Sequence, residues 1–197
     1  MQGIIGANGK LKIRHIRAPG PGLLWKLRNF PNVWRGVWRF GLAQLLGLPH
    51  LEGRLYIRHI LAGGKVVSYG LVSTRVVTTA FVNFVVDQLQ TETSEFGDFK
   101  YHDSGVGTTA AAVGDTDIET TDEESRATGT QTEGASANIY KSVGTISYTT
   151  TKAITEHGLF SQSSGTTLMD RHVFSAINVV NGDSIEFTYE LTVSAGG

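Results

Sequence analysis

The chain has 197 residues and a formal net charge of −1, with 40% hydrophobic and 18% charged residues. This length is sufficient for one domain with a sizeable core and an appendage. The chain contains no cysteine, which excludes disulfide bridges, thiolate zinc sites and cysteine nucleophiles. Its 24 glycines, with frequent serine and threonine, are typical of an all-β fold with many turns.

The charge is distributed unevenly along the chain. Residues 1–65 hold eleven Lys and Arg residues against one acid, Glu52, whereas residues 66–197 hold six basic and seventeen acidic residues. All three tryptophans and all four prolines also lie before residue 50. We therefore divide the chain into a basic, Trp/Pro-rich docking arm over residues 1–52 and an antiparallel β domain over residues 53–197.

The arm is expected to be extended, because residues 19–22 read Pro-Gly-Pro-Gly and break regular structure. Residues 33–48 predict one short amphipathic helix, a type that binds either a membrane surface or a groove on a protein. No apolar run is long enough to span a membrane. Aromatic and Arg side chains dominate protein interfaces, so we expect the arm to lie over an acidic partner surface. The candidate partner-binding residues are Trp25, Arg28, Phe30, Trp34, Arg35, Trp38, Arg39 and Phe40.

A twelve-residue segment occurs twice, at residues 9–20 and 53–64, with eight identical positions. Two copies are too few for a repeat architecture. The second copy predicts the first strand of a hairpin that continues from Lys65. The first copy predicts a similar strand that pairs with the sheet edge of a neighbouring subunit.

The C-terminal third predicts antiparallel strands. Apolar and polar residues alternate over residues 184–193, and residues 154–160 and 167–174 are joined by a turn that contains Gly165. Earlier in the chain, Thr78 or Thr79 can cap a helix over residues 80–90 that packs on the sheet. The fold class is therefore mainly β: an antiparallel β-sandwich or barrel-like domain with one short helix, preceded by the extended basic N-terminal arm.

The sequence contains no arrangement typical of an enzyme. Gly105, Gly107 and Ala110 match a dinucleotide fingerprint formally, but no hydrophobic helix follows them, so we expect no cofactor. Adjacent positions on one strand do not converge, which argues against a triad of His102, Asp103 and Ser104.

The remaining polar candidates are expected to be structural. The acidic run over residues 115–124 indicates a solvated loop, with a cation site at Asp115, Asp117 and Glu119 as the alternative. The six histidines are scattered, and Glu156 and His157 should point to opposite faces of one strand. Asp170 and Arg171 are expected to form cross-strand or inter-subunit pairs, weak if exposed.

The order Ile-Thr-Glu-His-Gly-Leu-Phe, a glycine turn, Leu-Met-Asp-Arg and Asn-Gly-Asp-Ser-Ile resembles that of small bacteriophage virion proteins. It is similar, more loosely, to the head-proximal domain of phage tail-collar fibre proteins. The resemblance covers residues 64–197 and implies a structural protein of the virion, assembled in the cytoplasm of the host bacterium. It also implies a homo-oligomer, with a trimer favoured.

Three functions follow as hypotheses. The first is a capsid decoration or cement protein that binds the major capsid protein or other virion proteins and stabilises the assembled shell. The second is a tail, collar or baseplate adaptor. The third is a nucleic-acid-binding protein that uses the basic, aromatic arm, since aromatics beside Arg can stack bases.

Overall fold

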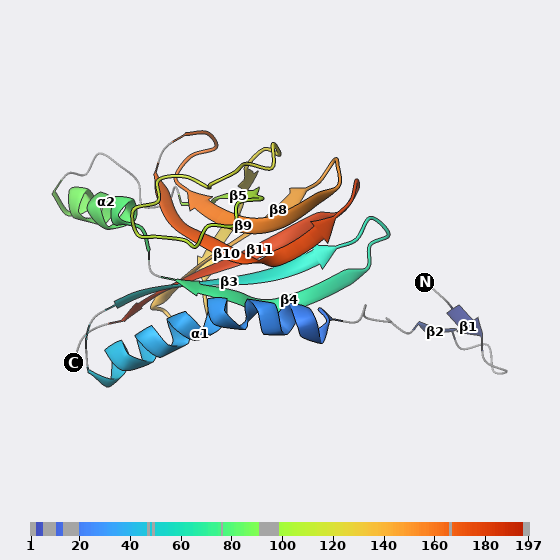
Figure 1. Cartoon of the computed structure of the whole chain (residues 1–197), viewed down its shortest axis with the longest axis horizontal. Coiled ribbons are helices and arrows are strands. Elements are labelled where there is room, and N and C mark those ends of the chain that lie inside the picture. Colours follow the sequence, from blue (N-terminus) through green and yellow to red (C-terminus); the bar gives the residue numbers. More distant parts are fainter. Residues whose placement is uncertain are drawn as a thin grey trace.

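The computed structural model describes residues 3–5, 11–13, 20–46, 48, 50–75, 77–90, 99–165 and 167–194. Two antiparallel sheets face each other and form the body of the molecule (Figure 1). One sheet has five strands in the order β4-β3-β11-β8-β7, and the other has four in the order β10-β9-β5-β6. The strands of the five-stranded sheet are β3 (His50–Ile60), β4 (Val66–Arg75), β7 (Thr130–Glu133), β8 (Ile139–Ser147) and β11 (Ser184–Ser194). Those of the four-stranded sheet are β5 (Tyr101–Gly105), β6 (Ala127–Thr128), β9 (Lys152–Phe160) and β10 (Leu168–Val179).

The predicted antiparallel β fold is confirmed. On β11, the central strand of the larger sheet, Ile185, Phe187 and Tyr189 are fully buried, and the polar residues between them are half-buried. Strands β9 and β10 pair as the expected hairpin. Gly165 in its turn has a φ of 68°, a left-handed conformation that glycine adopts without steric cost.

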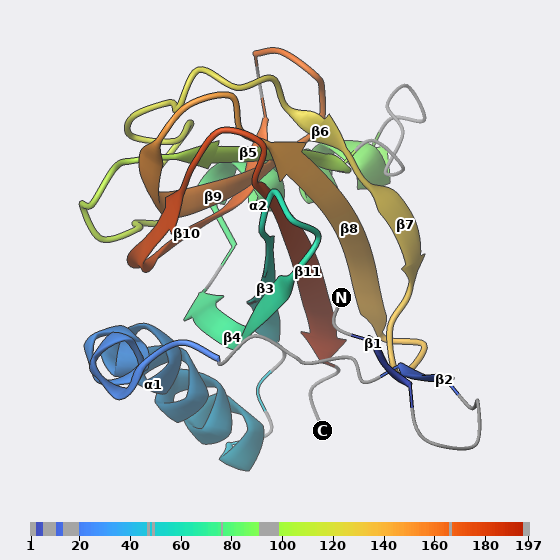
Figure 2. The same cartoon turned by 90° about the vertical axis from the view of Figure 1, so that its right-hand side faces the viewer.

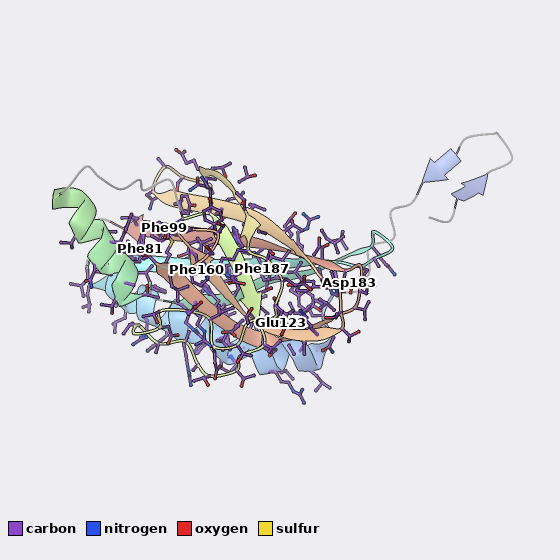
Figure 3. The ribbon with its side chains drawn as sticks, turned by 90° about the horizontal axis from the view of Figure 1, so that it is seen from above. Phe81, Phe99, Glu123, Phe160, Asp183 and Phe187 are labelled. Carbon is purple, nitrogen blue, oxygen red and sulfur yellow. The ribbon has the colours of Figure 1, made fainter. Side chains whose placement is uncertain are left out.

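The core lies between the two sheets and divides into two clusters. The larger one joins Leu55, Ile57 and Phe187 of the five-stranded sheet to Ile154 and Ile177 of the other. The second surrounds Phe81 and Phe99 beside α2 (Thr79–Gln90), whereas Asp183 lies towards the other end of the molecule (Figure 3). Each fully buried apolar side chain contributes about 1.5–3 kcal/mol, so these clusters account for the association of the sheets.

The predicted helix after Thr78 is also confirmed. The Thr78 hydroxyl accepts a hydrogen bond from the backbone N–H of Phe81, which caps the first turn of α2. Phe81 and Phe84 meet the ring of Phe99 edge-on, with centroids 5.1 and 4.9 Å away. These contacts seal one end of the core.

The N-terminal segment differs from the prediction of an extended arm with a short helix. Residues Leu23–Leu45 form one helix, α1, that begins ten residues earlier than expected. It lies outside the two sheets and runs beside β4 (Figure 2). The breakers at residues 19–22 thus precede a helix of 23 residues rather than keeping the chain extended.

The boundary placed at residue 52 falls inside β3, which pairs with β11 on one side and β4 on the other. The second copy of the repeat is therefore most of a central strand, and the predicted β3–β4 hairpin is confirmed. In the first copy, β2 (Leu11–Ile13) pairs with β1 (Gly3–Ile5). The rest of that copy, up to residue 19, lies outside the described residues, and pairing with a neighbouring subunit stays a prediction.

Candidate functional site

Helix α1 is fastened across the seam between β4 and β10, the strands that each end one sheet. The Asn29 side chain donates a hydrogen bond of 2.6 Å to the carbonyl of Val72 on β4. It also accepts one of 3.0 Å from the backbone N–H of Ser175 on β10. Edge strands carry unpaired backbone groups, and this one buried carboxamide bonds to such a group on each of the two strands.

Further polar contacts hold the helix along its length. The Trp25 indole donates to the carbonyl of Ser175 at 3.0 Å and meets the Tyr69 ring edge-on, with centroids 4.8 Å apart. About two turns further on, the Arg75 guanidinium donates to the carbonyl of Asn32 at 2.9 Å. The Thr74 hydroxyl donates to the carbonyl of Val33, also at 2.9 Å. The inner face of α1 is thus partly hydrogen-bonded rather than purely apolar.

Close approach at the middle of the helix requires a glycine. A Cβ at Gly36 would stand 1.7 Å from the Thr74 hydroxyl oxygen, closer than any real contact. Beyond it, Phe40 is buried and stacks on His50, with ring centroids 5.5 Å apart. The helix is therefore positioned by specific packing over most of its length.

The outer face of α1 is apolar and exposed. At its centre Trp34 and Trp38 are 53% and 69% exposed, and Leu45 near its end is 81% exposed. These residues recur at spacings of three and four, so they line one side of the helix. The outer face consists of Leu23, Leu24, Leu27, Phe30, Trp34, Val37, Trp38, Leu42 and Leu45. An apolar surface of this length on a folded chain is typical of an interaction site.

A basic row borders the outer face. Arg28, Arg35 and Arg39 are exposed along one flank of α1, and α1 itself contains no Asp or Glu. Among the residues that the structure describes, no carboxylate forms an ion pair with any of these three arginines. The face therefore presents apolar, aromatic and positively charged groups together. No described helix is long and apolar enough to cross a membrane.

Six of the eight candidate partner-binding residues are exposed on α1 as proposed from the sequence: Arg28, Phe30, Trp34, Arg35, Trp38 and Arg39. Phe30 and Trp34 stack with centroids 5.5 Å apart. The other two differ, because Trp25 is directed to the sheets and Phe40 is buried against His50. These two residues seat the helix instead of facing outward. The aliphatic residues of the outer face were not among the predicted site residues, because only a helix that begins at Leu23 places them on one side.

A cluster of three histidines lies inside the molecule. His102, His157 and His172 occupy β5, β9 and β10 and are fully buried. A hydrogen-bond distance of 2.9 Å joins His102 Nδ1 to His157 Nε2, and another of 2.9 Å joins His102 Nε2 to the Ser142 hydroxyl. Burial lowers the pKa of His102 to about 3. Burial, with the neighbouring His102 and His172, also lowers the pKa of His157 well below its usual value. His102 and His157 are thus neutral members of the core.

The acidic loop is organised around a buried carboxylate, Glu156. Its Oε1 accepts backbone N–H bonds from Gly107 and Thr120, and its Oε2 accepts one from Glu119 and one from Arg171 Nε. The Arg171 guanidinium also reaches Asp115 at 3.0 Å. Glu156 and His157 point to opposite sides of β9, as expected. Arg171 forms the expected cross-strand pair, with Glu156, and this pair is buried. Glu156 and Arg171 therefore hold this loop on the sheet, whereas His157 bonds to His102 and Asp170 accepts from the Tyr189 hydroxyl.

The same contacts occupy the groups that a dinucleotide site or a cation site in this loop would use. The N–H of Gly107 is occupied by Glu156, which leaves it unavailable to a phosphate. Asp115 and Glu119 pair with Arg171, and Asp117 lies 3.6 Å from Arg126. No group of three or more His, Asp or Glu side chains in the described part of the chain is arranged to hold a metal ion.

The residues of the formal triad also diverge. Ser104 hydrogen-bonds to Asp122, and Asp103 accepts from Arg126 at 2.8 Å. Burial raises the pKa of Asp103, against the opposing effect of Arg126. His102 turns to His157 and Ser142 instead. The three side chains therefore do not meet at one point.

Comparisons with protein-family models, with curated proteins and with solved structures find no match to this chain.

Proposed function

We propose that this chain is a non-enzymatic structural protein of a bacteriophage virion, a decoration or cement protein that docks on the assembled shell through the outer face of α1. The observation that carries the proposal is the arrangement of α1. The helix is fixed to both sheets by its inner face, yet its opposite face exposes Phe30, Trp34 and Trp38 beside arginines. A rigid helix pays little ordering cost on binding, and Trp and Arg are the residues that most often dominate interfaces.

The resemblance of the C-terminal strand pattern to phage virion proteins supports the same proposal. The partner is a major capsid protein or another virion protein. A homotrimer stays a prediction, which light scattering on the full chain would test. A single mass equal to the monomer at high concentration would contradict it.

The test is attachment of the purified chain to virions that lack it. Trp34→Ala and Trp38→Ala should each weaken attachment by about 30-fold, as expected for an interface anchor worth about 2 kcal/mol. Their unfolding free energies should stay close to that of the parent, because both side chains are exposed. Val113→Ala and Val180→Ala provide matched controls, since these apolar residues are 53% and 50% exposed but lie outside α1.

The stoichiometry of purified virions provides the second arm. Quantitative mass spectrometry should give a copy number near that of the major shell protein. A few copies per particle would favour the tail, collar or baseplate adaptor instead. Full attachment of both tryptophan variants would contradict docking through the outer face of α1.

A further inference from the structure

We propose that Arg35, Arg39 and Arg75 form a carboxylate-binding pocket, which receives an acidic side chain of the docking partner beside an apolar side chain held by Trp34 and Trp38. This inference rests on the proposed function, because it defines the chemistry of the partner that the outer face of α1 binds. Two of the arginines belong to α1, whereas Arg75 ends β4, in a part of the sequence far from the other two.

The first observation is a cavity between the helix and the sheet. It has a volume of about 100 Å³ and is lined by Arg35, Arg39, Arg75, Thr74, Ala110 and Ala111, among others. One water molecule occupies about 30 Å³ in the liquid, so the cavity has room for a small group such as a carboxylate. Its walls come from α1, from the end of β4 and from the loop that follows β5.

The second observation is that no direct ion pair joins these arginines to a carboxylate in the described parts of the chain, although the charge of Asp170 acts on Arg75 from a greater distance. Arg75 donates to the Asn32 carbonyl at 2.9 Å, to the Asn32 side-chain oxygen at 3.1 Å and to the Thr74 carbonyl at 2.9 Å, and all of these acceptors are neutral. Within the described parts of the chain, none of the three arginines forms an ion pair with a carboxylate. Other arginines of the protein do form such pairs, for example Arg126 with Asp103 and Arg171 with Glu156.

The electrostatics of Arg75 agree with this arrangement. Burial lowers its pKa, the buried Asp170 opposes that effect, and the nearby charges of Arg35 and Arg39 lower it further. Like charges that converge in a partly buried site raise the free energy of the free protein. Binding of a negative group relieves that repulsion.

The third observation joins the pocket to the apolar surface. Arg35 and Arg39 also border a second, more open hollow of about 430 Å³, whose other walls are Trp34 and Trp38. The two hollows therefore share a wall of two guanidinium groups. A ligand that fills both needs a negative group and an apolar group close together, as an acidic and an apolar side chain of one segment provide.

The chemistry of the whole outer face favours a protein over a nucleic acid. Trp34 and Trp38 with arginines suit a stacked base and its phosphate as well. The face continues, however, with aliphatic side chains such as Leu27, Leu42 and Leu45. These match an apolar protein surface and give a phosphate backbone nothing to bind.

The experiment titrates the full chain with a capped tetrapeptide of alternating leucine and glutamate, followed by tryptophan fluorescence. The glutamine counterpart of this peptide should bind at least about tenfold more weakly, since charge-assisted hydrogen bonds are lost. Arg39→Gln should weaken binding of the glutamate peptide by at least about tenfold. Lys26→Gln removes the same charge from an exposed position of α1 that lines neither hollow, so its affinity should stay within about twofold of the parent.

Three outcomes of the titration would overturn the inference. Equal binding of the glutamate and glutamine peptides would show that no carboxylate is recognised, and equal loss in Lys26→Gln and Arg39→Gln would reduce the effect to net charge. Binding of a short oligothymidylate that exceeds that of the peptide and depends on Arg39 would assign the pocket to nucleic acid.

Attachment to virions separates this inference from the proposed function. If the peptide requires Arg39 but Arg39→Gln attaches to virions as the parent does, the pocket is not a docking contact and the inference fails. The proposed function then still stands or falls on Trp34→Ala and Trp38→Ala. If those two variants attach fully, the docking function fails whatever the peptide does.

Discussion

The side chain of Asn29 on α1 accepts a hydrogen bond of 3.0 Å from the backbone N–H of Ser175 on β10, a residue 146 positions later in the chain. The same carboxamide donates to the Val72 carbonyl on β4. One buried side chain therefore ties the helix to the outer strands of both sheets. The outer face of α1 is presented in a fixed orientation because of this connection.

Asn29→Ala should lower the free energy of unfolding by about 1–3 kcal/mol, because it leaves a partly buried N–H of Ser175 and a buried carbonyl of Val72 without this partner. Urea denaturation measures this difference. Arg28→Ala, at the neighbouring exposed position, should change stability by less than about 0.5 kcal/mol. An equally small effect of Asn29→Ala would mean that α1 is not seated through this residue.

Two glycines of α1 provide a contrast between packing and helix propensity. Gly36→Ala should destabilise the protein by about 1–3 kcal/mol, because the new methyl group collides with Thr74. Gly41→Ala meets nothing within 4 Å and should stabilise the protein by up to about 1 kcal/mol, since alanine is the better helix former. Thermal unfolding of the two variants should therefore shift in opposite directions. A gain in stability for Gly36→Ala would contradict the close approach of α1 to β4.

Stability should fall as the pH drops from about 7 to about 5. The pKa of His102 is 6.5 in an unfolded chain and about 3 in the fold, and that of His157 is lowered as well. The stabilisation is complete above the unfolded pKa and is lost below it, because only the unfolded chain then binds protons. The loss approaches about 1.4 kcal/mol per pH unit for each histidine. Below this window the raised pKa values of Asp103 and Asp122 act in the opposite direction.

Chemical denaturation at a series of pH values checks this dependence. His157→Leu should reduce the slope of the free energy of unfolding against pH by up to about 1.4 kcal/mol per pH unit, whatever the stability of the variant at neutral pH. A stability that is constant between pH 7 and pH 5 would show that the buried histidines do not stay neutral.

Glu156→Gln should destabilise the protein by about 3 kcal/mol or more and loosen the loop after β5. Both carboxylate oxygens accept hydrogen bonds, so either orientation of the amide places an NH₂ group against a donor. Hydrogen exchange at the Gly107 and Thr120 amides should accelerate. Glu133→Gln is the control, because Glu133 is exposed on β7, and normal protection of both amides in Glu156→Gln would refute this role.

The sequence by itself determined strands β3, β4, β9, β10 and β11 and the second helix, but not β5, β6, β7 or β8. The alternation from Ser184 to Val193 and the cap at Thr78 are local signals, and each was sufficient because one face of the element meets the core. Sequence also predicted residues of the outer face of α1 and its basic border, since Trp34, Arg35, Trp38 and Arg39 are exposed as expected. Such predictions depend only on periodicity and residue type.

Only the tertiary structure decided which residues of the N-terminal segment face the sheets and which are exposed. The inner face of α1 combines Asn29 with Trp25 and Phe40, and its outer face is also rich in apolar residues, so periodicity alone could not separate Trp25 and Phe40 from the exposed residues. The partners of Asn29 lie 43 and 146 positions away, and Arg75 joins Arg35 and Arg39 only after β4 and α1 pack together. The buried histidines likewise come from three strands. Contacts at such separations depend on strand order and register, and a single sequence does not encode these in any local pattern.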